Sequence, residues 1–113
     1  MQKDIDIIIY GATGFTGQLC VKYFQSLNTG VNWAIAGRDQ EKLQKVASDN
    51  SIDVEILIAD SDDEAALDIL TSRAKVILST TGPFHRYGSK LVASCVKNSA
   101  NYVDITGENF WVK

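Results

Sequence analysis

Three glycines near the start of the chain have the spacing of a phosphate-binding turn. Gly11, Gly14 and Gly17 form a G-x-x-G-x-x-G pattern between an apolar segment and an amphipathic one. We expect Gly11 to allow a tight turn, Gly14 to let the backbone approach a pyrophosphate, and Gly17 to let a helix pack against a strand. The N–H groups and partial positive charge of that helix N-terminus would bind the phosphates, and Thr13 and Thr16 would add hydroxyl donors. The pattern favours dinucleotide binding over a purely structural turn.

The residues about twenty positions past these glycines indicate which dinucleotide is bound, because NAD sites usually carry there an acidic side chain that accepts from the ribose 2′-hydroxyl. This chain reads Ala36-Gly37-Arg38 instead. Gly37 leaves room, and the planar guanidinium of Arg38 suits a 2′-phosphate, although a solvated surface charge is the alternative. Asp39 is able to face the ribose, but we assign it to the N-cap of the next helix. The sequence therefore favours NADP.

Other strand ends extend the predicted site. Gly37, Gly82 and Gly107 each follow a predicted strand, at the edge where open α/β sheets bind ligands. Asp60 either accepts from the adenine amine or caps the helix that follows. The loop after the fourth strand is expected to pass beneath the ribose and nicotinamide. The cofactor-binding residues of this loop are Thr81, Gly82, Pro83 and Phe84. The Phe84 side chain either lines the nicotinamide pocket or packs in the core.

No residue is assigned a catalytic role. His85 is the only histidine and follows the loop next to the expected nicotinamide, so it is one candidate proton donor. Asp104, Thr106 and Glu108 lie on or just beyond the fifth predicted strand and are equally able to reach a substrate. Each of these is more simply interpreted as a solvated or structural side chain.

The elements that would position these residues alternate regularly along the chain. Strands are predicted over 5–10, 32–36, 54–59, 74–79 and 102–105, and a helix is predicted in each interval. Strands that alternate with helices imply parallel pairing and right-handed crossovers, so we expect a Rossmann-type doubly wound parallel sheet with strand order 3-2-1-4-5.

The helix faces and caps follow from apolar spacing and polar start signals. A capping box, Ser61-x-x-Glu64, is expected to open the third helix. Gly30 is expected to end the first helix as a left-handed cap. The predicted inner faces, in chain order, are Cys20, Tyr23, Phe24 and Leu27; Leu43, Val46 and Ala47; Ala66, Leu67 and Leu70; and Leu91, Val92, Cys95 and Val96.

Length and composition limit the remaining possibilities. The 113 residues, 45% of them hydrophobic, fit one domain spanning residues 1–113. A net charge of −3 argues against a nucleic-acid-binding face. Cys20 and Cys95 are 75 positions apart, so they form no CxxC metal or redox pair and are expected in the core of a protein of a reducing compartment, the cytoplasm. No apolar run approaches the length of a membrane span.

Several motifs in order give the chain a family resemblance. Besides the glycine turn and Ala36-Gly37-Arg38, they are Thr81-Gly82-Pro83-Phe84, Tyr87-Gly88 and Tyr102-Val103-Asp104-Ile105-Thr106-Gly107-Glu108. With them the chain resembles the saccharopine dehydrogenase-like oxidoreductases, closest to the branch that includes trans-acting enoyl reductases. The resemblance implies an N-terminal NADP-binding domain followed by a larger portion that binds substrate and forms a homodimer.

By position, the resemblance also assigns cofactor contacts. Arg38 would hold the 2′-phosphate, and Thr81, Gly82 and Pro83 would lie on the nicotinamide side. The residues that would hold the pyrophosphate are Gly11, Thr13, Gly14, Phe15, Thr16 and Gly17. The full-length protein would transfer hydride to or from an unsaturated, carbonyl or imine substrate, and this chain alone would be inactive.

Three alternatives remain open, and the first two, both enzymes, share a similar G-A-T-G-x-x-G opening. Extended short-chain dehydrogenases need a Tyr-x-x-x-Lys pair, and Tyr87-Gly88-Ser89-Lys90 is one residue too short. A protein like N-acetylglutamyl-phosphate reductase is the second alternative, and a non-catalytic regulator that senses NADP is the third.

Overall fold

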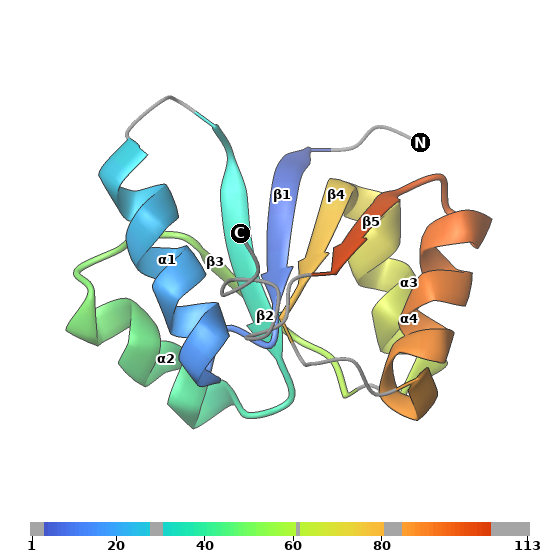
Figure 1. The fold of residues 1–113 in the computed structure, drawn as a ribbon, viewed down its shortest axis with the longest axis horizontal. Helices are drawn as coiled ribbons and strands as arrows, with labels where there is room; N and C mark the ends of the chain where they lie inside the picture. The colour runs from blue at the N-terminus through green and yellow to red at the C-terminus, as the bar shows by residue number, and fades with distance from the viewer. Residues whose placement is uncertain (1–3, 28–30, 61, 81–84, 105–113) are drawn as a thin grey trace, which may run out of the picture.

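Strands and helices alternate along the chain as predicted. The computed structural model describes residues 4–27, 31–60, 62–80 and 85–104. The strands are β1 (Ile5–Tyr10), β2 (Trp33–Gly37), β3 (Glu55–Ile58), β4 (Ala74–Ser79) and β5 (Asn101–Asp104). They pair in parallel in the order β3-β2-β1-β4-β5 (Figure 1), which confirms the predicted sheet. Several strand ends are shifted by one residue from the predicted bounds.

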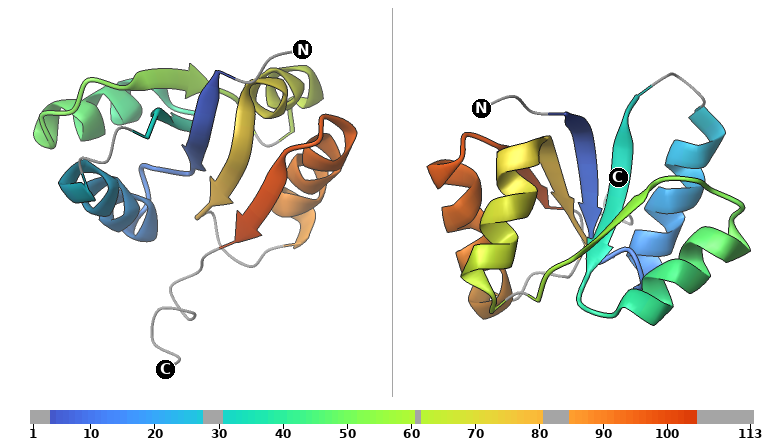
Figure 2. Two further views of the ribbon diagram at one scale, coloured as in Figure 1. Left: turned by 90° about the horizontal axis from the view of Figure 1, so that it is seen from above. Right: turned by 180° about the vertical axis from the view of Figure 1, so that it is seen from behind.

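Two helices cover each face of this sheet. The helices are α1 (Phe15–Leu27), α2 (Gln40–Asp49), α3 (Glu64–Arg73) and α4 (His85–Lys97). Figures 1 and 2 show α1 and α2 on one face and α3 and α4 on the other. The order in which strands are added to the sheet therefore reverses between β1 and β4, and doubly wound sheets bind ligands at such a switch point. Within the described residues, no helix is long and apolar enough to cross a bilayer.

Both faces of the central strand β1 are buried. Ile8 and Tyr10 belong to the apolar cluster that includes residues of α3 and α4, whereas Ile9 belongs to the cluster that includes residues of α1 and α2. Since side chains alternate between the faces of a strand, a strand covered on both sides must be apolar throughout. This burial explains the nearly continuous apolar run that predicted the strand.

Two of the predicted helix faces are partly wrong. On α1, Tyr23 is 61% exposed, and Val21 is fully buried instead. On α4, Val92 and Val96 are exposed, while Ser94 is buried because its hydroxyl bonds Thr71 at 2.8 Å across the contact with α3. Apolar spacing locates a helix, but on α4 a polar contact with α3 decides which flank faces inward.

The start of α3 also differs from the prediction. Its N-cap is Asp63, which has an extended backbone and whose carboxylate accepts the Ala66 N–H at 3.1 Å. The predicted capping box that starts at Ser61 is therefore wrong. A carboxylate accepts a stronger hydrogen bond than a hydroxyl and also complements the helix dipole. Ser61 and Gly30 lie outside the described residues. At its other end, α3 passes directly from Arg73 into β4 at Ala74.

An ion-pair network lies at the edge of the sheet where the strands begin. The guanidinium of Arg73 donates to both carboxylate oxygens of Asp4, at 3.1 and 2.7 Å, and to both of Glu55, at 2.7 and 2.8 Å. These hydrogen bonds from Arg73 lower the pKa of each carboxyl group. The network joins the end of α3 to the starts of β1 and β3, on the side away from the glycine turn.

Candidate functional site

The glycine turn lies at the carboxyl end of β1, beside the start of α1 (Figure 1). Gly11 has a φ of 87°, in the left-handed region that favours glycine. Its N–H donates to the carbonyl of Ala36 at 2.8 Å, and the N–H of Ala12 donates to the same oxygen at 3.4 Å. The turn is thereby held against the end of β2, next to Gly37 and Arg38.

Gly17 is required by packing inside the chain. It is the third residue of α1, and a Cβ added to it would lie 2.2 Å from the carbonyl oxygen of Gly11 and 2.7 Å from the Cα of Ala12. Both neighbours are backbone atoms of the turn, which cannot move aside without changing the turn. A glycine here therefore lets α1 start directly against the turn.

No packing inside the described chain explains Gly14. Gly14 is exposed and has no left-handed φ. The nearest atom to an added Cβ is the Gly11 carbonyl oxygen at 3.7 Å, an ordinary contact. Apart from its chain neighbours, the added carbon would meet no other described atom within 4 Å. The turn thus leaves open a place that a side chain would fill, as expected where a ligand contacts the backbone.

The N-terminus of α1 is suited to bind an anion. Its first intrahelical hydrogen bond runs from the Gln18 N–H to the Gly14 carbonyl at 2.9 Å, so the N–H groups of residues 15–17 precede that bond. The first turn of α1 holds no acidic residue, whereas α2 and α3 carry Glu41 and Glu64 there. The partial positive charge of α1 is therefore not neutralised by its own side chains. The Gln18 side chain also donates to the Thr13 carbonyl at 2.9 Å and fixes the turn.

The residues after β2 and β3 lie at the same edge of the sheet. Arg38 is exposed directly after β2, and Asp39 caps α2 by accepting the Lys42 N–H at 3.1 Å, which confirms its assignment as a cap. Asp60 is exposed and accepts the Asp62 N–H at 2.9 Å. Asp60 is thus a turn residue and not the cap of α3, which leaves one of its oxygens for another partner.

Two buried hydroxyl groups join the strand ends. Neither is among the predicted site residues, although Thr80 begins the loop that is expected to pass beneath the ribose and nicotinamide. The Tyr10 hydroxyl donates to the Ala59 carbonyl at 2.9 Å, and burial, followed by the negative charge of Asp60, raises the pKa of Tyr10 to about 12. The Thr80 hydroxyl lies 2.9 Å from the Gly11 carbonyl oxygen. Their position at strand ends is the only sequence signal, because the bonds themselves depend on pairing between distant segments.

Several predicted site residues are described only in part or lie outside the described residues. Phe15 and Thr16 start α1, His85 starts α4 and Asp104 ends β5, but their side chains are not described. The predicted residues that lie outside the described ranges are Thr81, Gly82, Pro83, Phe84, Thr106 and Glu108. Among residues 4–27, 31–60, 62–80 and 85–104, no group of His, Cys, Asp or Glu side chains is arranged to hold a metal ion. Cys20 and Cys95 are buried in the core, as predicted.

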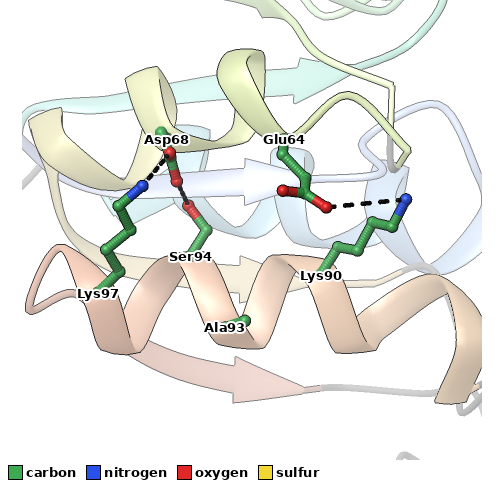
Figure 3. A pocket seen from close by; sticks show the side chains of 6 residues that line it. All are labelled: Glu64, Asp68, Lys90, Ala93, Ser94 and Lys97. Atoms are coloured by element: carbon green, nitrogen blue, oxygen red, sulfur yellow. Dashed lines mark hydrogen bonds and ion pairs between the residues drawn. The ribbon is translucent and has the colours of Figure 1, made fainter.

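Two other hollows are less suited to a phosphate ligand. A cavity of about 210 Å³ lies between α3 and α4 (Figure 3), and there Asp68 accepts from Ser94 at 2.6 Å and from Lys97 at 2.9 Å. Its polar groups are therefore already paired with one another. The second hollow is lined by four carboxylates that would repel a phosphate: Asp60, Asp62, Asp63 and Glu64.

Sequence comparison relates the chain to known proteins. The family model described as saccharopine dehydrogenase NADP binding domain matches residues 7–112. The trans-acting enoyl reductase of Mycobacterium tuberculosis is 38% identical over 110 residues, which cover 95% of this chain and 26% of that protein. A lipid droplet localized protein of Caenorhabditis elegans is 36% identical, over 96% of this chain and 28% of that protein. The chain spans about a quarter of the length of these curated relatives.

Solved structures share the fold. Apo saccharopine dehydrogenase (L-Glu forming) from Saccharomyces cerevisiae superposes with a TM-score of 0.72 at 21% identity, over 88% of this chain and 21% of that one. A short-chain dehydrogenase/reductase from Veillonella parvula in complex with NADP gives 0.70 at 14% identity, over 88% of this chain and 46% of that one. At these identities the similarity shows the Rossmann-type fold alone.

Proposed function

The chain belongs to the saccharopine dehydrogenase NADP binding domain family, and from that premise we propose how its own residues hold NADP(H). The turn from Gly11 to Gly14 and the N-terminus of α1 bind the pyrophosphate. Arg38 binds the 2′-phosphate, and its guanidinium makes charge-assisted hydrogen bonds to the phosphate oxygens. The family match also favours this assignment over the two other dehydrogenase types that share the opening motif.

Gly14 is the observation that carries the proposal. Neither a close contact nor a left-handed backbone requires glycine there, and an added Cβ would approach no described atom beyond its chain neighbours more closely than 3.7 Å. A phosphate bound at that place receives helix N–H donors and meets no acidic side chain from the first turn of α1. The donor set therefore fits a pyrophosphate.

The remaining contacts follow the order of the strands along the sheet. Adenosine lies over the ends of β2 and β3, where Gly37 leaves room and Asp60 accepts from the adenine amine. The nicotinamide lies toward the end of β4, where the proposed contacts come from the loop after that strand. The further cofactor-binding residues in this proposal are Thr13, Phe15, Thr16, Thr81, Gly82, Pro83 and Phe84.

For the whole protein we propose an oxidoreductase in which residues 1–113 form the NADP-binding domain. When bound, the nicotinamide supplies or accepts a hydride at C4, and the substrate is an unsaturated, carbonyl or imine compound. That substrate is bound mainly by parts of the protein beyond these residues, so this chain alone gives no turnover. A homodimer and a cytoplasmic location complete the proposal, and the two buried free cysteines support a reducing compartment.

Titration with both cofactors tests the 2′-phosphate assignment. We expect micromolar binding of NADPH and weaker binding of NADH. Because hydrogen bonds to charged groups contribute about 1.5–3 kcal/mol, Arg38→Ala should weaken NADPH binding by about 10- to 100-fold and leave NADH binding nearly unchanged. Lys42→Ala, which removes an exposed cation four residues away on α2, is the matched control and should change neither affinity. Equal wild-type affinity for the two cofactors, or an unchanged preference in Arg38→Ala, would refute the assignment.

A further inference from the structure

Thr80 places a buried hydroxyl directly behind the glycine turn. The residue follows β4 and is only 8% exposed. Its Oγ1 lies 2.9 Å from the Gly11 carbonyl oxygen and 3.1 Å from the Tyr10 carbonyl oxygen, and its N–H donates to the Tyr10 carbonyl at 3.0 Å. The residue that follows β4 therefore contacts two successive carbonyl groups where β1 ends and the turn begins.

The Gly11 carbonyl is the group whose direction matters most for an anion. It also accepts the Gly14 N–H at 3.2 Å, so two donors hold it on the protein side of the turn. Gly11 is the residue of the turn with left-handed backbone, and glycine crosses between backbone conformations more freely than other residues. If this peptide rotated, its carbonyl oxygen would be free to face the space before α1, where its partial negative charge would repel a phosphate.

We propose that Thr80 is a positioning residue for the dinucleotide, acting through the Gly11 carbonyl. Its hydroxyl keeps that oxygen turned toward β4, so that the anion meets the N–H groups of α1 and not a carbonyl. This inference rests on the proposed binding of the pyrophosphate by the turn. The inference adds to the site Thr80, which follows β4 and whose side chain lies on the protein side of the turn.

The pyrophosphate is common to NADPH and NADH, which gives the inference a distinctive signature. Loss of the Thr80 hydroxyl should weaken the binding of NADPH and of NADH by the same factor and leave the preference between them unchanged. Loss of Arg38 should change the preference, because the 2′-phosphate is present in only one of them. The two residues are thereby separable in a single set of titrations.

The experiment compares Thr80→Val with Thr80→Ser in the full 113-residue chain. Valine replaces the hydroxyl by a methyl group and leaves a buried carbonyl with one donor fewer, so we expect about tenfold weaker binding of both cofactors, or 1.4 kcal/mol. Serine retains the hydroxyl and should bind within about twofold of wild type. Thr71→Val removes an equally buried hydroxyl from α3 and is the matched control. It should lower stability without changing either affinity.

Amide hydrogen exchange of the cofactor-free chain supplies a second readout. The Gly14 N–H should exchange faster in Thr80→Val than in wild type, because its acceptor is less firmly held, and Thr80→Ser should restore the protection. If Thr80→Val fails to fold, Thr80→Ala, which introduces no larger group, replaces it in both measurements.

Four results would overturn the inference. Wild-type affinity in Thr80→Val, or unchanged Gly14 exchange, would show that the hydroxyl does not position the turn while leaving the proposed function intact. Equal losses in Thr71→Val and Thr80→Val would show a general effect of stability. Failure of the wild-type chain to bind either cofactor would refute the proposed function and this inference with it.

Discussion

Replacing Gly17 by alanine should destabilise the fold, whereas replacing Gly14 by alanine should weaken NADPH binding and leave the fold intact. The Cβ of Gly17→Ala would lie 2.2 Å from the Gly11 carbonyl oxygen, where contacts of 3.4 Å or more are ordinary. Overpacking commonly costs about 1–3 kcal/mol, and here the neighbours are backbone atoms that cannot rotate away. We therefore expect a cost at the upper end of that range, about 3 kcal/mol, reduced by up to about 1 kcal/mol of helix propensity to a net loss of about 2 kcal/mol.

Gly14→Ala should leave the free energy of unfolding nearly unchanged. Its Cβ meets only the Gly11 carbonyl oxygen at 3.7 Å, and its backbone is not left-handed. Alanine lowers the entropy of the unfolded chain, which stabilises by about 0.4–1 kcal/mol, and it is a poorer residue before a helix by a similar amount. These effects nearly cancel. The added methyl group occupies the place proposed for the pyrophosphate, so binding of NADPH should fall by about 100-fold or more, equivalent to about 2.7 kcal/mol.

Denaturant unfolding and NADPH titration of the two variants check this reasoning. A domain of this size has a stability of about 5–15 kcal/mol, so a loss of about 2 kcal/mol in Gly17→Ala is readily measured. If Gly14→Ala binds NADPH as wild type does, the ligand does not approach that residue. If Gly14→Ala unfolds as easily as Gly17→Ala, the turn has internal contacts other than those described above.

Three further outcomes follow from the hydrogen bonds at the two edges of the sheet. The Arg73 network lowers the pKa of Asp4 and Glu55, so it stabilises the fold above their unfolded pKa values of about 4 and is lost as pH falls through the folded ones. The difference in melting temperature between wild type and Arg73→Met should therefore be largest near neutral pH and shrink under acid. Ultraviolet titration should show one tyrosine ionising near pH 12, absent in Tyr10→Phe, and the stability from this buried neutral phenol should be lost as pH rises from 10 to 12. Asp39→Ala should lower the free energy of unfolding by about 1 kcal/mol, with an unchanged ratio of NADPH to NADH affinity if the carboxylate only caps α2.

The fold was predictable because its signals are local. The apolar run over β1, the amphipathic helices and the short connections determine a parallel sheet. The rule of right-handed crossovers leaves few strand orders, and the glycine turn favours the order of dinucleotide-binding domains. Gly17 was also predictable, since its role follows from a turn that leads straight into a helix. The identity of the α3 cap was not, because Ser61 and Asp63 both satisfy the sequence rule and only the backbone geometry chooses between them.

The contacts that shape the candidate site were less accessible to sequence reasoning. Thr80 and Tyr10 bond to carbonyl groups of other strands, and any residue supplies a carbonyl, so no residue type reveals the partner. The inward flank of α4 was misjudged for a related reason. Ser94 turns inward for a hydrogen bond to Thr71 on α3, at the expense of the more apolar Val96.

The direct passage from Arg73 to Ala74 has an evolutionary consequence. With no residue between α3 and β4, one inserted residue would shift β4 by one position and exchange the faces of Ile77 and Leu78, which lie in opposite apolar clusters. Length changes among natural homologues should therefore be strongly selected against at this junction. Changes in ligand specificity can then arise in the longer connections at the opposite edge, while the junction keeps the side chains of β4 on their present faces of the sheet.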